Sequence, residues 1–454
     1  MSRSNAAQLL KILDPSGDVQ AFANAAHDFS QSVIRPLDHT LDERNAFPHA
    51  LWKQLGDQSL LGVTIPEEYG GLGQGYLAHL AIMEEISRAS GSIGLSYIAH
   101  SNLCMNQIAL NASDEQKQKY LPGLVAGDNV GALAMSEPGA GSDVMSMTLR
   151  ADAVDGGFLL NGRKQWITNG GTADVLVVYA KTDPVAGSKG VTTFLIEKGM
   201  PGFSPGKKEN KEGMRGSETY ELIFEDCFVP ASQVMGPVNG GAKVLMRGLN
   251  YERLLLAGGP LGLAQSALDT TIAHTSEREQ FGKPLAANQA LAHEIAAMHS
   301  RLLMARSHAY MAAAAADQQD LTNDLAASVF YECSDTAMDI TRRCITLCGG
   351  MGFTRDLPLG RYHRDAELYE IGGGARHIRL DIIARYLLPA YEATFKRQPV
   401  NQPVSNIAAH APLSPLEQHF RNADRPGLLA PAPIEQNPSI TGPEPLHIRD
   451  QRLG

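Results

Sequence analysis

The sequence predicts an α+β protein with a helical N-terminal domain, a middle antiparallel β-barrel or sandwich, and a C-terminal helical bundle. Apolar residues recur at helical spacing over residues 1–130, short β-branched segments divided by turns fill residues 131–238, and long helical patterns return over residues 239–395. Residues 396–454 are rich in proline and have no sustained period, so we expect an extended or disordered tail there.

The N-terminal domain is predicted from stretches with helical periodicity, AFANAAHDFSQSVIRPL, HLAIMEEISRAS and SYIAHSNLCMNQIALNA. The glycine-serine stretch GSIG is expected to separate the second from the third. A further helix should begin in ASDEQKQKYLPGLVAGD, where Ser113 is the expected N-cap because acidic residues occupy the first turn.

The middle domain is predicted from short segments in which β-branched residues alternate or cluster: GALAMS, MTLRADAV, FLLNGRKQWI, DVLVVYA, GVTTFLIEK and ELIFEDCFV. The turn sequences DGG, NGG and SKG divide these segments. Such spacing suits a small antiparallel barrel or sandwich.

The C-terminal bundle is predicted from the stretches QALAHEIAAMHSRLLMARSHAYMAAAAAD and LTNDLAASVFYECSDTAMDITRRCITLC, which are helical in pattern. With LNYERLLLAGGP they indicate an antiparallel arrangement of helices. Pro260 should kink or end the first of these helices, because proline lacks a backbone donor.

Composition limits the class of function. The formal net charge of −10 argues against a nucleic-acid partner. The chain has no run of about 18 apolar residues, so we expect no membrane span. The five cysteines form no CxxC pair, so we expect buried, reduced thiols. The N-terminus has no secretory core and no acidic residue before Asp14. We expect a cytoplasmic protein, with the mitochondrial matrix as the alternative.

Two motifs in the middle domain suit a planar or phosphate-bearing ligand. In AMSEPGAGSD, the small residues around Gly141 expose backbone N–H groups, although an ordinary tight turn is an equal alternative. In KQWITNGG, Trp166 and Thr168 would share one face of a strand and hold a flat heterocycle. A core tryptophan is the alternative, and this motif alone slightly favours it.

Further motifs lie in the C-terminal domain. Arg278 in REQFGKP can grip a phosphate, although a solvated surface charge is the commoner role. The glycines of LCGGMGF and LYEIGGGARHIR allow a ligand close to the backbone near helix ends, or serve as flexible interhelical loops. Glu252, in LNYERLLLAGGP, is a carboxylate in an apolar run, which costs desolvation energy unless the group is used or paired.

Together, MSEPGAGSD, WITNG, REQFGKP, CGGMGF and YEIGGG strongly resemble the acyl-CoA dehydrogenase family over about residues 20–390. SYIAHSNLCMNQ, EKGMPGFS, ELIFEDC and ERLLLAGGPLGL are typical of the branch that acts on isovaleryl-CoA. The resemblance implies a C-terminal four-helix bundle, a homotetramer, an FAD in each subunit and electron-transfer flavoprotein as the acceptor. It also implies a flavoprotein oxidoreductase of leucine catabolism that takes a short branched-chain acyl-CoA.

The resemblance also implies the catalytic base. Most branches carry a glutamate where this chain has Gly373, whereas the isovaleryl branch carries it on the helix that holds Glu252. Glu252 would remove the α-proton while the β-hydride passes to flavin N5, and Leu254–Leu256 would raise its pKa by desolvation. The backbone N–H of Gly373 and a ribityl hydroxyl of FAD would bind the thioester oxygen. Glu370 is the rival base, at a position that lies away from the flavin in the family.

Other roles follow by position in the family. Residues matched to FAD contacts are Leu133, Met135, Ser136, Gly141, Ser142, Trp166, Thr168, Leu347, Gly349, Gly350, Gly374 and Ala375, with Arg278 and Gln289 contributed by a neighbouring subunit. Residues matched to acyl-CoA contacts are Leu103, Ser142, Ser188, Lys189, Lys243, Asn250, Arg253, Leu256, Gly372 and Gly373. For Arg253, an ion pair with a nearby carboxylate is an equal alternative.

The chain departs from the family pattern in places. GARH at 374–377 replaces a sequence of the GTS type, Lys243 replaces an aromatic residue, and the proline-rich tail is additional. Arg376 and His377 could therefore change the grip on the FAD adenosine. The rival functions are a dehydrogenase or oxidase for a longer branched or terpenoid acyl-CoA, and a flavin-binding scaffold without turnover.

Overall fold

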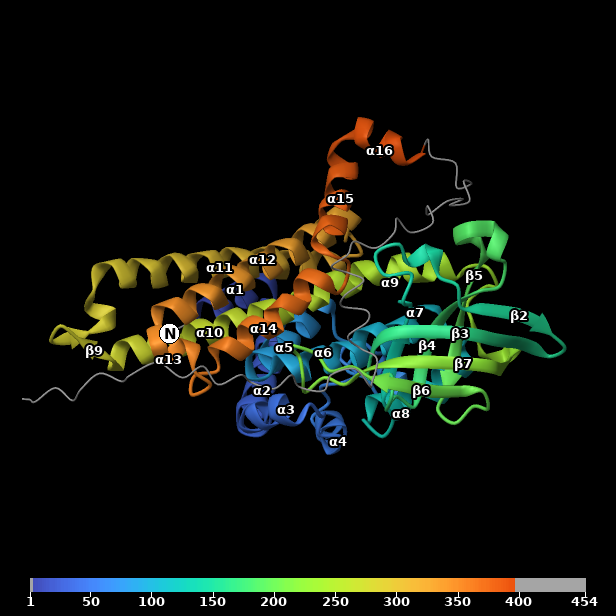
Figure 1. Ribbon diagram of the computed structural model, residues 1–454, viewed down its shortest axis with the longest axis horizontal. Helices are drawn as coiled ribbons and strands as arrows, with labels where there is room; N and C mark the ends of the chain where they lie inside the picture. Colours follow the sequence, from blue (N-terminus) through green and yellow to red (C-terminus); the bar gives the residue numbers. More distant parts are fainter. Residues whose placement is uncertain (1–2, 397–454) are drawn as a thin grey trace, which may run out of the picture. The chain divides into compact units, whose positions relative to one another are not determined.

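The computed structural model describes residues 3–396, which belong to one compact unit. Helices, then strands, then helices follow one another along the chain, so the predicted fold class is confirmed (Figure 1). The domain boundaries stay predictions, and the predicted tail lies outside the described residues except for its first. Within residues 3–396, no helix has the length and apolar character needed to cross a membrane.

Short helices build the N-terminal part: α1 (Arg3–Leu13), α2 (Asp18–Phe29), α3 (Asp38–Arg44), α4 (Ala50–Asp57), α5 (Tyr76–Ala89), α6 (Gly91–Ile98), α7 (Gln107–Asn111) and α8 (Asp114–Val125). Ser113 caps α8 in a reciprocal capping box with Gln116, as predicted. The prediction for GSIG is wrong, because the break falls before it. Ser90 is the N-cap of α6, and GSIG forms the first turn of that helix.

The middle part is one eight-stranded sheet in the order β6-β7-β3-β2-β4-β5-β8, with β1 paired to β4. Its strands are β1 (Gly131–Ala134), β2 (Arg150–Val154), β3 (Gly157–Thr168), β4 (Val175–Lys181), β5 (Val191–Glu197), β6 (Phe203–Lys208), β7 (Thr219–Pro230) and β8 (Val234–Met235). The β1–β4 and β2–β4 pairs are parallel, and the other pairs are antiparallel. Along β4, Val177 and Tyr179 join the core shared with the helices, whereas Leu176 and Val178 join the core of the sheet itself.

Longer helices follow: α9 (Gly241–Leu256), α10 (Gly258–Glu277), α11 (Gln289–Asp317), α12 (Asn323–Leu347), α13 (Gly349–Phe353), α14 (Leu359–Ile371), α15 (Arg376–Leu387) and α16 (Pro389–Lys396). A small hairpin of β9 (Glu279–Gln280) and β10 (Lys283–Pro284) joins α10 to α11. Helices α10, α11, α12 and α14 pack on one another, and α10 also packs on α5 (Figure 1). Pro260 lies in the first turn of α10, so the preceding helix ends before it, as predicted.

A buried ion pair joins the N-terminal helices to the bundle. Arg306 of α11 donates to the Glu84 carboxylate of α5 from Nε at 2.8 Å, and the Tyr310 hydroxyl donates to the same carboxylate at 2.8 Å. Because removal of one partner would leave a buried charge, this cluster fixes α5 against α11.

A second contact between the same helices caps α5. Its N-cap residue is Gly75, which has no side chain to accept from the first N–H groups. Asp317 at the end of α11 supplies the missing acceptor, at 2.5 Å from the Tyr76 N–H and 3.3 Å from the Leu77 N–H. The carboxylate therefore serves as an N-cap from a distant part of the chain.

We expect Asp317→Ala to lower the free energy of unfolding by about 1 kcal/mol, the usual effect of losing an N-cap. Urea denaturation followed by circular dichroism measures this change. Asp320→Ala is the matched control, because Asp320 lies just beyond the same helix with no hydrogen-bonded side chain among the described residues. Equal losses in the two variants would contradict the capping role.

Candidate active site

Glu252 lies in the last turns of α9, on a face that also buries leucines. The residue is only 5 % exposed. Burial raises the pKa of its carboxyl group to about 7, and the positive charge of Arg253 opposes the shift. Among residues 3–396, no donor hydrogen-bonds to this carboxylate. Glu252 is therefore a proton acceptor poised near neutral pH.

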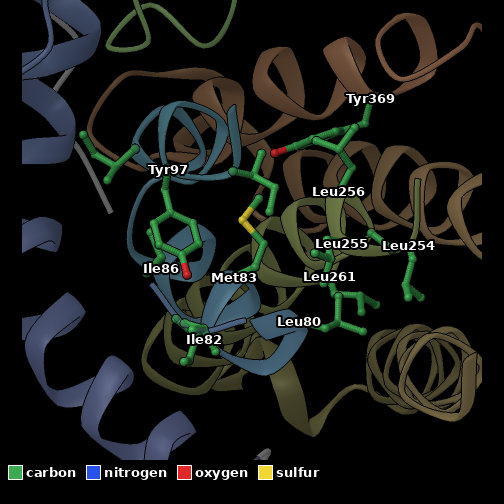
Figure 2. Close-up of a cluster of buried hydrophobic side chains, with 14 of the residues drawn as sticks. Leu80, Ile82, Met83, Ile86, Tyr97, Leu254, Leu255, Leu256, Leu261 and Tyr369 are labelled. Atoms are coloured by element: carbon green, nitrogen blue, oxygen red, sulfur yellow. The ribbon is translucent and has the colours of Figure 1, made fainter. Parts of the chain in front are cut away.

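An apolar cluster continues from Glu252 along α9 into α10. Leu254, Leu255 and Leu256 are buried in one core with Met83 and Tyr369 (Figure 2). Water is excluded from this region, which gives Glu252 its low-dielectric surroundings.

The glycine loop after α14 lies against the same part of α9. Gly373 has a φ of +65°, and a Cβ atom there would stand 2.6 Å from the Phe330 ring and 2.8 Å from Leu256. No side chain fits at this position without displacing its neighbours. A side chain at Gly373 would displace Leu256 of α9, the helix that also carries Glu252. Among the described residues, no acceptor takes the Gly373 N–H.

The rival carboxylate, Glu370, is already engaged. The Arg376 guanidinium donates to Glu370 at 3.2 Å and to Asp335 at 2.6 Å, and it stacks over the Tyr331 ring at 4.6 Å. Arg376 is thus held by carboxylates of its own chain. Glu370 is less available as a base than Glu252.

Arg253 is buried beside Glu252, yet no ion pair holds it within the described part of the chain. Its only hydrogen bond there runs from Nη1 to Asn250 at 3.4 Å, and its buried Nε has no partner. A Cβ atom on Gly374 would lie 3.8 Å from this guanidinium. The ion-pair alternative for Arg253 is not realised, and its free donor faces the glycine loop.

The loop AMSEPGAGSD, which is predicted to contact the flavin, begins at the end of β1. Leu133 is buried in β1, while Met135 and Ser136 are partly buried beyond its end. At Gly139 and Gly141, a Cβ atom would meet nothing within 4 Å. The loop therefore has open space on the side where a ligand is expected.

Trp166 is not a core residue, so the alternative favoured on its motif alone is wrong. Its side chain is 54 % exposed, and its backbone has a φ of +59°. A register shift between Lys164 and Ile167 interrupts the pairing of β3 with β7. Trp166 lies within this irregularity, where its indole is exposed. Thr168 is partly buried at the end of β3, and its shared face with Trp166 stays a prediction.

Sequence analysis missed a buried ion pair beneath this loop, formed by Lys164 and Glu137. The two side chains are 0 % and 3 % exposed, and Nζ lies 2.9 Å from the carboxylate. Lys164 also donates to the Met135 carbonyl at 2.8 Å, and Glu137 accepts from the Thr148 and Leu149 N–H groups at 2.6 and 2.9 Å. The ion pair therefore holds Met135 and Glu137 of the loop against β3. A lysine inside the strand pattern of FLLNGRKQWI was the signal available.

The remaining predicted site residues are distributed over the surface and the loops. Exposed residues are Ser142, Ser188, Lys189, Lys243, Arg278, Gln289, Gly349 and Gly350, and partly buried residues are Leu103, Asn250, Leu347, Gly372 and Ala375. Arg278 follows α10, whose 20 residues span about 30 Å and begin where the Glu252 helix ends. Arg278 and Gln289 therefore lie beyond the end of α10 that is remote from Glu252, and their contribution to the site of a neighbouring subunit stays a prediction.

The residues present fit a flat cofactor and a thioester substrate. The exposed indole of Trp166, the open turn at Gly141 and the unused N–H of Gly373 all lack a covering partner among residues 3–396. Two buried polar atoms have no partner among the described residues: Nε of Arg253, the residue next to Glu252, and the Tyr369 hydroxyl in the adjoining apolar core. Such atoms cost free energy unless a ligand binds them.

Three family models match the chain. They are acyl-CoA dehydrogenase, N-terminal domain, over residues 16–128; acyl-CoA dehydrogenase, middle domain, over residues 132–227; and acyl-CoA dehydrogenase, C-terminal domain, over residues 239–388.

Individual relatives agree with the family models. Isovaleryl-CoA dehydrogenase, mitochondrial, of Solanum tuberosum is 52% identical over 368 residues, covering 81% of this chain and 89% of that protein. The 2-methylacyl-CoA dehydrogenase, mitochondrial, of the same plant is 48% identical with the same coverage. A glutaryl-CoA dehydrogenase from Mycobacterium smegmatis, solved with FADH2, has a TM-score of 0.79 at 29% identity and covers 84% of this chain and 98% of that one. This chain belongs to the acyl-CoA dehydrogenase family.

Proposed function

We propose that the protein catalyses the FAD-dependent α,β-dehydrogenation of a short branched-chain acyl-CoA such as isovaleryl-CoA. One observation carries the proposal. Glu252 is a buried carboxylate on α9, the helix whose Leu256 and Arg253 lie against the glycine loop, and Gly373 in that loop has no room for a side chain. The base must then come from α9.

Glu252 removes a proton from the α-carbon of the thioester. Its pKa of about 7 lets the carboxylate be ionised at working pH and still accept a proton. General-base help of this kind is worth roughly 10²–10⁴-fold in rate.

The chain also stabilises the charge that develops on the thioester oxygen. The Gly373 N–H has no other acceptor among residues 3–396, and the positive charge of Arg253 lies close to the same loop. FAD, when bound, supplies the redox chemistry by accepting the β-hydride.

The cofactor would be held mainly by the middle domain. Met135, Ser136 and the turn at Gly141 would approach its ring system, with the Trp166 indole against one face. At α13, a Cβ atom on Gly349 or Gly350 would meet nothing within 4 Å, which leaves room for the cofactor of a neighbouring subunit. Arg278 and Gln289 would reach that cofactor in a homotetramer.

A branched acyl group is favoured by the names of the two plant relatives. The 2-methylacyl relative makes a 2-methyl-branched acyl-CoA the alternative substrate. Electron-transfer flavoprotein is the proposed acceptor. The cytoplasmic location, with the mitochondrial matrix as the alternative, stays a prediction, and both plant relatives carry the word mitochondrial in their names.

The decisive experiment is an anaerobic titration of the purified flavoprotein with isovaleryl-CoA. We expect the flavin absorbance to bleach in the wild type and hardly at all in Glu252→Gln, because the amide cannot accept the α-proton. Glu370→Gln is the matched control and should bleach like the wild type. A wild type that is yellow but bleached by no acyl-CoA would instead support the scaffold without turnover.

The rate of flavin reduction should rise with pH through about 7 and then level off. The base acts only when deprotonated, and burial raises its pKa to about that value. Anaerobic stopped-flow mixing between about pH 5.5 and 9 measures the profile. A midpoint near the ordinary pKa of a free carboxyl group would contradict a desolvated Glu252.

Steady-state assays should favour short branched acyl-CoAs over long-chain or terpenoid ones. Leu256 and Phe330 press on Gly373 of the glycine loop, and Leu256 with Leu103 would limit the depth of the acyl pocket. Each surplus methylene is expected to cost about 1–3 kcal/mol of discrimination. Parallel assays with a dye acceptor and with oxygen alone separate a dehydrogenase from an oxidase. Faster turnover of a long chain would overturn this specificity.

A further inference from the structure

Arg379 of α15 is a fully buried guanidinium that none of the predicted roles uses. The residue is 0 % exposed. It donates from Nε to the Gly374 carbonyl at 2.7 Å, from Nη2 to the Tyr369 carbonyl, and from Nη1 to Ser334 Oγ at 2.6 Å and the Phe330 carbonyl at 3.2 Å. Every one of these partners is neutral.

The contacts of Arg379 close the glycine loop at both ends. Tyr369 lies in the last turn of α14, just before the loop, and Gly374 lies at its end. One planar guanidinium binds both carbonyls, so the chain between them forms a fixed arch. Gly373, at the centre of that arch, carries the N–H that has no acceptor within residues 3–396.

The same guanidinium fixes the wall behind the arch. It stacks on the Phe330 ring, with 4.2 Å between the guanidinium carbon and the ring centroid. The opposite neighbour of that ring is Gly373, whose Cβ position lies 2.6 Å from it. Phe330 therefore contacts both the Arg379 guanidinium and the Gly373 position of the loop.

A buried arginine without a carboxylate partner is costly. Within the described part of the chain, no carboxylate pairs with Arg379, and its nearest acidic neighbour, Glu370, is bound to Arg376 instead. Arg253 adds a second unpaired guanidinium beside Gly374. Two cations converge on this loop, which suits a ligand on which negative charge develops.

We propose that Arg379 is the positioning residue of the thioester site: it holds the arch from Tyr369 to Gly374 so that the Gly373 N–H points at the thioester oxygen, and with Arg253 it makes the loop electropositive. This inference rests on the proposed function. It assigns to Arg379, Arg253 and the Gly373 N–H the task of making the α-proton of the thioester more acidic. During proton removal, the α-carbon proton goes to Glu252, and the electron pair is drawn onto the thioester oxygen facing the loop.

A 3-thiaacyl-CoA tests this step apart from the redox step; the probe is 3-thiabutanoyl-CoA, in which sulfur with a single methyl group stands in place of the branched β-carbon of isovaleryl-CoA. Sulfur at the β-position leaves no β-hydride to transfer, so the enzyme can only ionise the α-carbon and produce a long-wavelength absorption with the oxidised flavin. The holoenzyme of wild type, Arg379→Met and Arg376→Gln would be titrated. Arg376 is the matched control, because it lies on the same helix but is bound by Asp335 and Glu370.

We expect Arg379→Met to ionise the bound analogue about ten- to a hundredfold less than wild type, the effect of disturbing one oxyanion donor. Affinity for the analogue, measured by ultrafiltration, should change little, and Arg376→Gln should ionise it normally. Arg379→Lys keeps the charge without the planar fork and should stay impaired. Full recovery with lysine, or equal losses in the methionine and glutamine variants, would overturn the positioning role.

The outcomes separate the two proposals. A wild type that binds the analogue without ionising it would refute the proposed function itself. A wild type and an Arg379→Met variant that ionise it equally would refute only the role of Arg379. If Arg379→Met yields no folded flavoprotein, Ser334→Ala removes one anchor of the guanidinium and should reduce ionisation in the same direction; unchanged ionisation there would count against the proposal.

Discussion

The absence of space at Gly373 is the constraint on which the site depends. The Cβ position of Gly373 lies so close to Leu256 and Phe330 that the loop offers only N–H groups there. In the proposed mechanism the acid–base group therefore comes from α9, whose leucine face takes Glu252 into the core. The proposal thus assigns hydrogen-bond donation to the loop and proton acceptance to the helix.

Buried charge organises both halves of the molecule in different ways. Beneath the middle-domain loop, Lys164 and Glu137 neutralise each other and satisfy surrounding backbone groups. Between α11 and α5, Arg306 and Glu84 neutralise each other and bind the side chains of Gln265 and Tyr310. Such buried ion pairs fix the packing of neighbouring elements. Around the glycine loop the charges are left uncompensated, which is unfavourable for the fold alone and useful to a reacting ligand. This contrast supports the proposed site at the glycine loop more strongly than burial alone does.

Sequence reasoning reached the order of domains, the cap at Ser113 and the helix end before Pro260, because each rests on local periodicity or on a motif. The candidate base came from the family resemblance and stays a proposal. Local reasoning failed where packing decides: GSIG is helical because Ser90 caps it, and Trp166 is exposed at an irregularity of the strand pairing, so the core tryptophan that its motif favours is not found. The role of Arg379 could not be predicted, because the sequence shows only an arginine within a helical pattern. Its three carbonyl partners come from two other helices and a loop, which only the folded structure brings together.

The left-handed backbone of Trp166 affects the stability of the folded protein when no ligand is bound. A bulky residue in that conformation carries roughly 1–3 kcal/mol of strain, and its indole also leaves apolar surface in water. Any flat molecule that covers the ring returns part of that energy, so binding and folding become thermodynamically linked. With FAD as that molecule, the steady amount of folded protein in a cell would follow the supply of the vitamin from which flavins are made.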